Sequence, residues 1–184
     1  MKNRCEWAKS EIMIKYHDKE WGVPVHDDRK LFEMLILEGA QAGLSWETIL
    51  KRREGYRKAF DNFNVVKISK YSEEDVKRLL NDEGIIRNRL KIRSTINNAK
   101  LFLEVKKEFG SFDKYIWGFV SNKTIKNKHK KVSTIPANTL ISDDLSKDLK
   151  KRGFNFVGST ICYAFMQSTG MINDHLVNCF RYNK

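Results

Sequence analysis

One stretch decides the fold class: LKKRGFNFVG, residues 149–158. It separates two segments with the apolar spacing of helices, the first capped by Ser142 and ending at Arg152, the second running from Ser159 to Gly170. Glycines near both ends of the loop permit tight turns and close approach of another backbone. The pattern predicts a helix-hairpin-helix element over about 142–170.

The start of the second hairpin helix is a candidate anion site. Its free backbone N–H groups and positive dipole end follow Gly158, an arrangement that suits a DNA phosphate. Lys151 and Arg152 add positive charge beside the loop. We expect DNA contacts at Gly153, Gly158, Ser159, Lys151 and Arg152. The alternative is an ordinary helix turn in which Gly153 is only a C-cap.

The charge of the chain supports an acidic partner. Among 184 residues there are 35 Lys and Arg against 23 Asp and Glu, a net charge of +12. Nucleic acid is the first candidate and an anionic membrane surface the second, and the alternative is a merely basic cytosolic protein. No stretch approaches the roughly 18 to 20 apolar residues of a spanning helix. No apolar run follows the N-terminus, so no signal peptide is expected. We therefore expect a cytoplasmic protein whose three cysteines are not in disulfides.

The rest of the chain also reads as helical, and we expect one domain over residues 1–184. No convincing pair of strands is found, so the predicted class is all-α. A polar, lysine-rich stretch at 121–139 reads as an exposed loop. Helices are predicted over 30–44, 46–60 after an N-cap at Ser45, 72–84 after a capping box at Ser72, 89–109 and 112–120.

Two Cys/His pairs stand near opposite ends of the chain. Cys5 and His17 form one pair, and His175 and Cys179 the other, which would project from one helix face if that segment is helical. Two cysteines and two histidines can close a tetrahedral structural zinc site with no open position for water. The alternative is four unrelated residues. Cys162 lies in an apolar helix and reads as a buried small side chain.

Several blocks resemble the bacterial DNA-3-methyladenine glycosylase I family, and the similarity runs over nearly the full length. The resemblance implies an all-α, two-lobed helix-hairpin-helix glycosylase fold, with one zinc ion held by Cys5, His17, His175 and Cys179. It also implies a base-binding pocket between the lobes. The blocks are RCEW (4–7), YHDKEWGVP (16–24), LEGAQAGLSW (37–46), GIIRNR (84–89), LKKRGFNFVG (149–158) and NDHLVNC (173–179).

The same resemblance assigns roles to residues of the pocket. Glu38 matches the acidic residue that contacts the flipped base and is the catalytic candidate. Tyr16, Trp46 and Trp21 match the aromatic lining, and Trp7 is expected close by. This agrees with the chemistry, because a base must leave the stack before it is attacked, and an alkylated base is a flat cation that stacks on aromatic rings. The alternative is that the aromatics belong to the core and that Glu38 is an exposed helix residue.

These observations predict a monofunctional enzyme that hydrolyses the N-glycosidic bond of 3-methyladenine in double-stranded alkylated DNA. Related lyase-type enzymes carry a lysine where this chain has Ser159-Thr160, which argues against Schiff-base chemistry. Asp174 is expected to be structural. Alternatives are a non-catalytic helix-hairpin-helix DNA-binding protein, a zinc hydrolase, and a glycosylase of broader alkylbase specificity. A monomer is the default, with no membrane partner.

Overall fold

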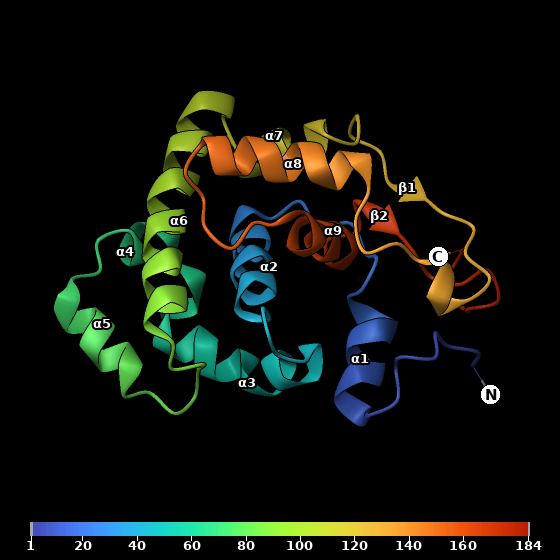
Figure 1. Ribbon diagram of the computed structural model, residues 1–184, viewed down its shortest axis with the longest axis horizontal. Coiled ribbons are helices and arrows are strands. Elements are labelled where there is room, and N and C mark those ends of the chain that lie inside the picture. Colours follow the sequence, from blue (N-terminus) through green and yellow to red (C-terminus); the bar gives the residue numbers. More distant parts are fainter. Residues whose placement is uncertain (1, 184) are drawn as a thin grey trace.

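The computed structural model describes residues 2–183 and is built from helices around one central helix (Figure 1). The all-α prediction is confirmed, apart from one very short pair of strands. No helix in the described part of the chain has the length and apolarity needed to cross a bilayer. The helices are α1 (Glu11–Lys19), α2 (Asp28–Ala40), α3 (Trp46–Ala59), α4 (Val65–Ile68), α5 (Glu73–Leu80), α6 (Arg89–Phe109), α7 (Phe112–Gly118), α8 (Leu140–Lys151) and α9 (Ser159–Ser168), with short 3₁₀ helices at Asp61–Phe63 and Val132–Thr134.

Helix α2 is the centre of the molecule. Every residue from 31 to 40 is buried, as expected of a helix that is apolar on nearly all sides. It contacts α3, α6, α7 and α9, which surround it in Figure 1. Two acidic residues lie on its buried surface. Glu33 accepts hydrogen bonds from Arg53 and Arg57, whereas Glu38 has no ion-pair partner among the described residues.

The predicted hairpin is present as α8, the loop 152–158 and α9. Ser142 is not the N-cap that was expected. Thr139 caps α8, and Ser142 is the third helical residue, whose hydroxyl completes a capping box by accepting from the Thr139 N–H. Gly153 has φ +93, a conformation that glycine adopts without strain, and it ends α8. The side chain of Asn98 in α6 holds the loop by bonding both the N–H and the C=O of Asn155.

The lysine-rich stretch 121–139 is largely a loop, but it is fastened to the segment that follows α9. Strands β1 (Ile125–Lys126) and β2 (Ile172–Asn173) pair in parallel. The N–H of Val177 then donates to the C=O of His129 at 2.9 Å. The strand pair was not predicted, because two residues per strand are too few to show an alternating pattern.

Three further differences from the predicted elements bear on the site. Helix α2 ends at Ala40 and not at Leu44, because Lys91 Nζ donates to the C=O groups of Ala40 and Ala42, at 2.8 and 2.7 Å, and Gly43 turns the chain at φ +77. Helix α1 was not predicted. The segment that carries His175 and Cys179 is not helical, so the shared helix face that their spacing would allow does not arise; both residues lie in an irregular turn after β2.

Candidate active site and metal cluster

A pocket of about 350 Å³ opens between α1, α2 and α3 on one side and α9 with the 121–139 loop on the other. Its size is in the range of small-molecule sites. All five residues predicted for the base site line it. The full lining is Trp7, Met13, Tyr16, Trp21, Glu38, Gln41, Trp46, Val132, Ile135, Ala164 and Gln167.

The aromatic side chains form an angled wall. The rings of Tyr16 and Trp46 lie 5.4 Å apart at 57°, and those of Trp7 and Trp21 lie 5.0 Å apart at 80°. The Nε1 atom of Trp46 is buried and has no hydrogen-bond partner among the described residues. Such a wall offers π faces and one free donor to a flat ring.

Glu38 lines this pocket, with only 4% of its surface exposed. Burial raises the pKa of its carboxyl to about 8, and the neighbouring Ser168 hydroxyl only partly opposes the shift. The phenol of Tyr16 also has a raised pKa, chiefly because it is buried and next because Glu38 is close. A buried carboxyl without a cation beside it is costly to ionise, which marks Glu38 as a group kept for binding or chemistry.

The sequence reasoning missed part of the lining. Gln41 and Gln167 bring two amides to the pocket, and Val132 and Ile135 bring an apolar edge from the lysine-rich loop. Gln167 stands on the same helix face as Ala164, a spacing that could have drawn attention to it. The loop residues gave no signal, because no periodicity places an irregular segment against a distant helix.

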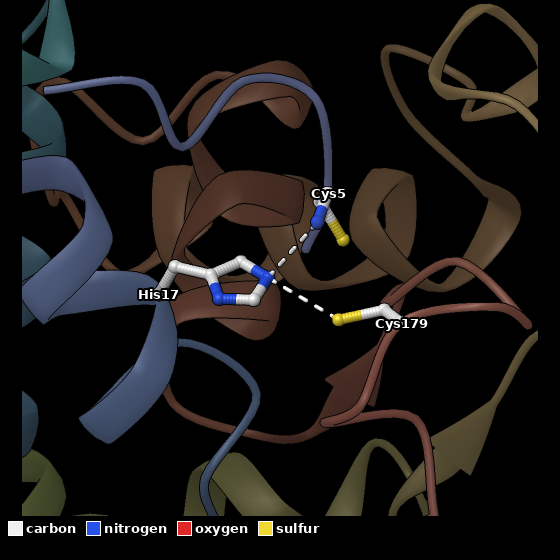
Figure 2. Close-up of side chains that lie close together, drawn as sticks. All are labelled: Cys5, His17 and Cys179. Carbon is white, nitrogen blue, oxygen red and sulfur yellow. Dashed lines mark hydrogen bonds between the residues drawn. The ribbon is translucent and has the colours of Figure 1, made fainter. Parts of the chain in front are cut away.

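Cys5, His17 and Cys179 form a buried cluster whose ligand atoms all lie within 4.8 Å of one another (Figure 2). The Nε2 atom of His17 lies 3.4 Å from Cys179 Sγ and 3.4 Å from the backbone N of Cys5. These three residues could hold a metal ion. They join segments that are far apart in sequence, and they are three of the four predicted ligands; the fourth, His175, is not part of this close group.

The two histidines are held so that each turns a lone pair inward. Asp18 is ionised, since its contact with Arg4 lowers its pKa to about 2, so its carboxylate accepts a hydrogen bond from the His17 Nδ1–H at 2.9 Å. The amide oxygen of Asn173 accepts likewise from His175 Nδ1 at 3.0 Å. The Nε2 atom of His175 is buried and has no hydrogen-bond partner among residues 2–183. Partners of this kind on the outer nitrogen are typical of metal-binding imidazoles.

The cluster and the pocket share a wall. The ring of Trp7 packs edge-on against His17 at 5.2 Å, and the ring of Trp21 packs against His175 at 4.6 Å. The two histidine rings lie 4.9 Å apart. A metal ion that fixed these imidazoles would therefore also fix two of the pocket's indoles.

The residues predicted to contact DNA occupy different environments. Lys151 is exposed, and a side chain at Gly158 would meet nothing within 4 Å, so this N-terminus of α9 is open. Ser159 donates to Asp143. Arg152 is paired with Glu108 at 2.7 Å and Asp148 at 2.8 Å. Because the side chains of Ser159 and Arg152 are already paired, Lys151 and the backbone at 158–159 are the groups free to meet a phosphate.

The sequence model of the methyladenine glycosylases matches residues 7–182, almost the whole chain. The chain belongs to the methyladenine glycosylase family. Among its relatives, DNA-3-methyladenine glycosylase 1 of Escherichia coli is 51% identical over 180 residues, covering 97% of this chain and 96% of that protein.

Solved methyladenine glycosylase structures share the fold closely. One is 3-methyladenine DNA glycosylase I from Staphylococcus aureus, described for its recognition of 3-methyladenine, with 34% identity, a TM-score of 0.96 and coverage of 99% of this chain and 97% of that one. Another is a Y16F variant of 3-methyladenine DNA glycosylase I in complex with 3-methyladenine, with 34% identity, a TM-score of 0.95 and coverage of 99% and 98%.

Asp174, which was predicted to be a structural residue, is fully buried in this methyladenine glycosylase. It accepts hydrogen bonds from Tyr163 at 2.5 Å, Gln167 at 2.7 Å and Asn127 at 2.7 Å. It therefore ties α9, the lysine-rich loop and the segment after β2 together beneath the pocket.

Proposed function

We propose that this protein is a base-excision repair enzyme that hydrolyses the N-glycosidic bond of 3-methyladenine in alkylated double-stranded DNA. The observation that carries the proposal is the buried carboxyl of Glu38 in the lining of a pocket walled by Tyr16 and Trp46. Membership in the methyladenine glycosylase family and the names of the relatives support the same substrate.

Substrate binding follows from the aromatic wall and the raised pKa of Glu38. An alkylated base is positively charged while it is attached to its sugar, so Tyr16 and Trp46 attract it through their ring faces. Its charge also replaces the missing cation beside Glu38 and favours the ionised carboxylate, which accepts hydrogen bonds from the exocyclic amine. A neutral base gains neither this attraction to the aromatic rings nor this charge pairing with Glu38. The pocket therefore favours the damaged base over the normal one.

The chemical step needs little from the protein, because methylation has already made the base a good leaving group. The bond between the sugar carbon and the base breaks with its electron pair moving into the cationic ring. Water forms the new bond to that carbon and loses a proton to solvent. Glu38 stabilises the positive charge that develops on the sugar. Ser159 and Thr160 stand where a lyase would need an amine, so we expect no strand cleavage.

DNA is held on the side where the pocket opens. Phosphate contacts are assigned to the α9 N-terminus at Gly158 and Ser159, to the turn at Gly153, and to Lys151, with Arg152 contributing if it leaves its acidic partners. Leu44 is 40% exposed in the turn between Gln41 and Trp46, two pocket residues. An apolar side chain there can wedge into the gap that a flipped base leaves.

One structural zinc ion, held by Cys5, His17, His175 and Cys179, completes the proposed enzyme. The orphaned Nε2 of His175 and the inward lone pair of His17 fit a closed Cys₂His₂ set. Such an ion supplies folding energy and no reaction step. Trp7 packs against the imidazole of His17, and Trp21 packs against that of His175. The proposed form is a monomer.

The test is release of free bases from methylated duplex DNA, separated by chromatography, for the wild type, Glu38→Gln and Glu38→Ala. We expect the wild type to release 3-methyladenine without strand cleavage and both variants to be strongly impaired. A wild type that binds this DNA and releases no base would refute the enzyme and leave a DNA-binding module. Release of 7-methylguanine at a similar rate would show the broader specificity.

A further inference from the structure

Gln167 brings a side-chain amide into the pocket. The orientation of this amide is fixed by a buried carboxylate, that of Asp174. The residue lies on α9, is half-buried and lines the cavity. Its Nε2 donates to Asp174 Oδ2 at 2.7 Å. No described residue donates to its Oε1 atom. An amide has one donor end and one acceptor end, so engaging the donor leaves the acceptor for whatever enters the pocket.

Asp174 is the acceptor in each of its side-chain hydrogen bonds. Its Oδ2 receives the Tyr163 hydroxyl at 2.5 Å as well as the Gln167 amide, and its Oδ1 receives the Asn127 amide at 2.7 Å. A flipped Gln167 amide would bring two acceptor oxygens together beside a fully buried carboxylate, which is unfavourable. The environment therefore holds the amide in one orientation.

We propose that Gln167, oriented by Asp174, presents a fixed hydrogen-bond acceptor to the flipped base and so selects alkylpurines with an exocyclic amine over those with a carbonyl at that position. This inference rests on the proposed function and extends it to discrimination between 3-methyladenine and 3-methylguanine. Adenine carries an amine at C6, where guanine carries an oxygen. The amine can donate to Oε1, whereas the oxygen would face it acceptor to acceptor.

Glu38 makes this distinction only while its carboxyl is ionised. Burial raises the pKa of that carboxyl to about 8 in the free protein, and a protonated Glu38 would donate to a carbonyl, whereas the amide oxygen of Gln167 can only accept. Gln41, the other amide of the pocket, has no side-chain partner among the described residues and is free to turn over. Of the two amides that line the pocket, Gln167 is thus the one whose direction is set by a partner in the described chain.

The experiment compares kcat/KM for release of 3-methyladenine and of 3-methylguanine from duplex DNA. We expect the wild type to favour 3-methyladenine and Gln167→Leu to lower the ratio by about tenfold, because losing a positioned acceptor removes both the attraction and the repulsion. Gln41→Leu makes the same change in the same pocket and should leave the ratio as it was, whatever it does to either rate. Asp174→Asn should lower the ratio as Gln167→Leu does, since its amide lets Gln167 turn over.

The outcomes separate the two hypotheses. A wild type that releases neither base removes the proposed function itself. A wild type that releases both bases with equal kcat/KM leaves the function standing and overturns the selection by Gln167. Selection by Gln167 is also overturned if Gln167→Leu reduces both rates alike and leaves the ratio unchanged, because that is the result of a purely structural role. If thermal melts show that Asp174→Asn does not fold, the two glutamine variants decide alone.

Discussion

Replacing Glu38 by glutamine should stabilise the free protein while strongly impairing its ability to release 3-methyladenine. The carboxyl is 4% exposed and has no cation beside it among the described residues. Its pKa is about 8 in the folded chain against 4.5 for an ordinary glutamate. The unfolded chain therefore binds fewer protons than the folded one above pH 4.5, and stability falls as pH rises.

The size of the effect follows from these two values. Each pH unit between 4.5 and 8 costs about 1.4 kcal/mol, so at pH 7 the carboxyl lowers the free energy of unfolding by about 3 kcal/mol. Glutamine has nearly the same shape and no proton to lose, so Glu38→Gln avoids this cost. In a chain of this size the gain corresponds to a rise in melting temperature of roughly 10 °C.

The assay is urea unfolding of the wild type and Glu38→Gln from pH 5 to pH 8. We expect the difference between them to be small at pH 5 and to widen with pH until it levels off near pH 8. Effects of pH on other groups, including metal ligands, are shared by both proteins and cancel in the difference. A gap that stays constant over this range would mean that Glu38 is ionised when the pocket is empty, and the reasoning would fail.

Three other perturbations test separate parts of the site. Cys179→Ser should abolish stoichiometric metal binding and lower the melting temperature by roughly 10 °C, measured by metal analysis and calorimetry, and a metal-free wild type that melts as before would contradict this. Trp46→Ala should reduce kcat/KM for 3-methyladenine ten- to a hundredfold through lost stacking, whereas Trp117→Phe, a core change away from the pocket, tests whether any indole loss has this effect. Lys151→Ala should weaken DNA binding equally for damaged and undamaged duplexes and reduce the salt dependence by about one ion, and an unchanged salt slope would remove this residue from the interface.

Local signals in the sequence predicted the helices well. The bounds expected for α6 agree with the structure at both ends, and the predicted N-cap at Ser45 and capping box at Ser72 are present. These features depend on neighbours within one helical turn. The hairpin was predicted for the same reason, although Thr139 and not Ser142 caps its first helix.

Features that depend on distant contacts were predicted less well. The spacing of His175 and Cys179 would place both on one face if their segment were helical, but this segment follows β2, which pairs with β1, and forms an irregular turn. The contributions of Val132 and Gln167 to the pocket follow from a loop and a helix that meet only in the folded chain. The pocket residues that were predicted came from the family resemblance, since composition and spacing alone left them as core aromatics.

The hydrogen bond from the Leu176 N–H to Cys5 Sγ joins residues 171 positions apart, and the pocket likewise draws on both ends of this span. During synthesis on the ribosome, Glu38 and Trp46 therefore emerge long before Gln167 and Cys179 exist. A nascent chain carries the carboxyl and part of the aromatic wall, but neither the opposite side of the pocket nor the complete metal cluster. The pocket and the metal cluster are therefore completed only when translation is nearly finished.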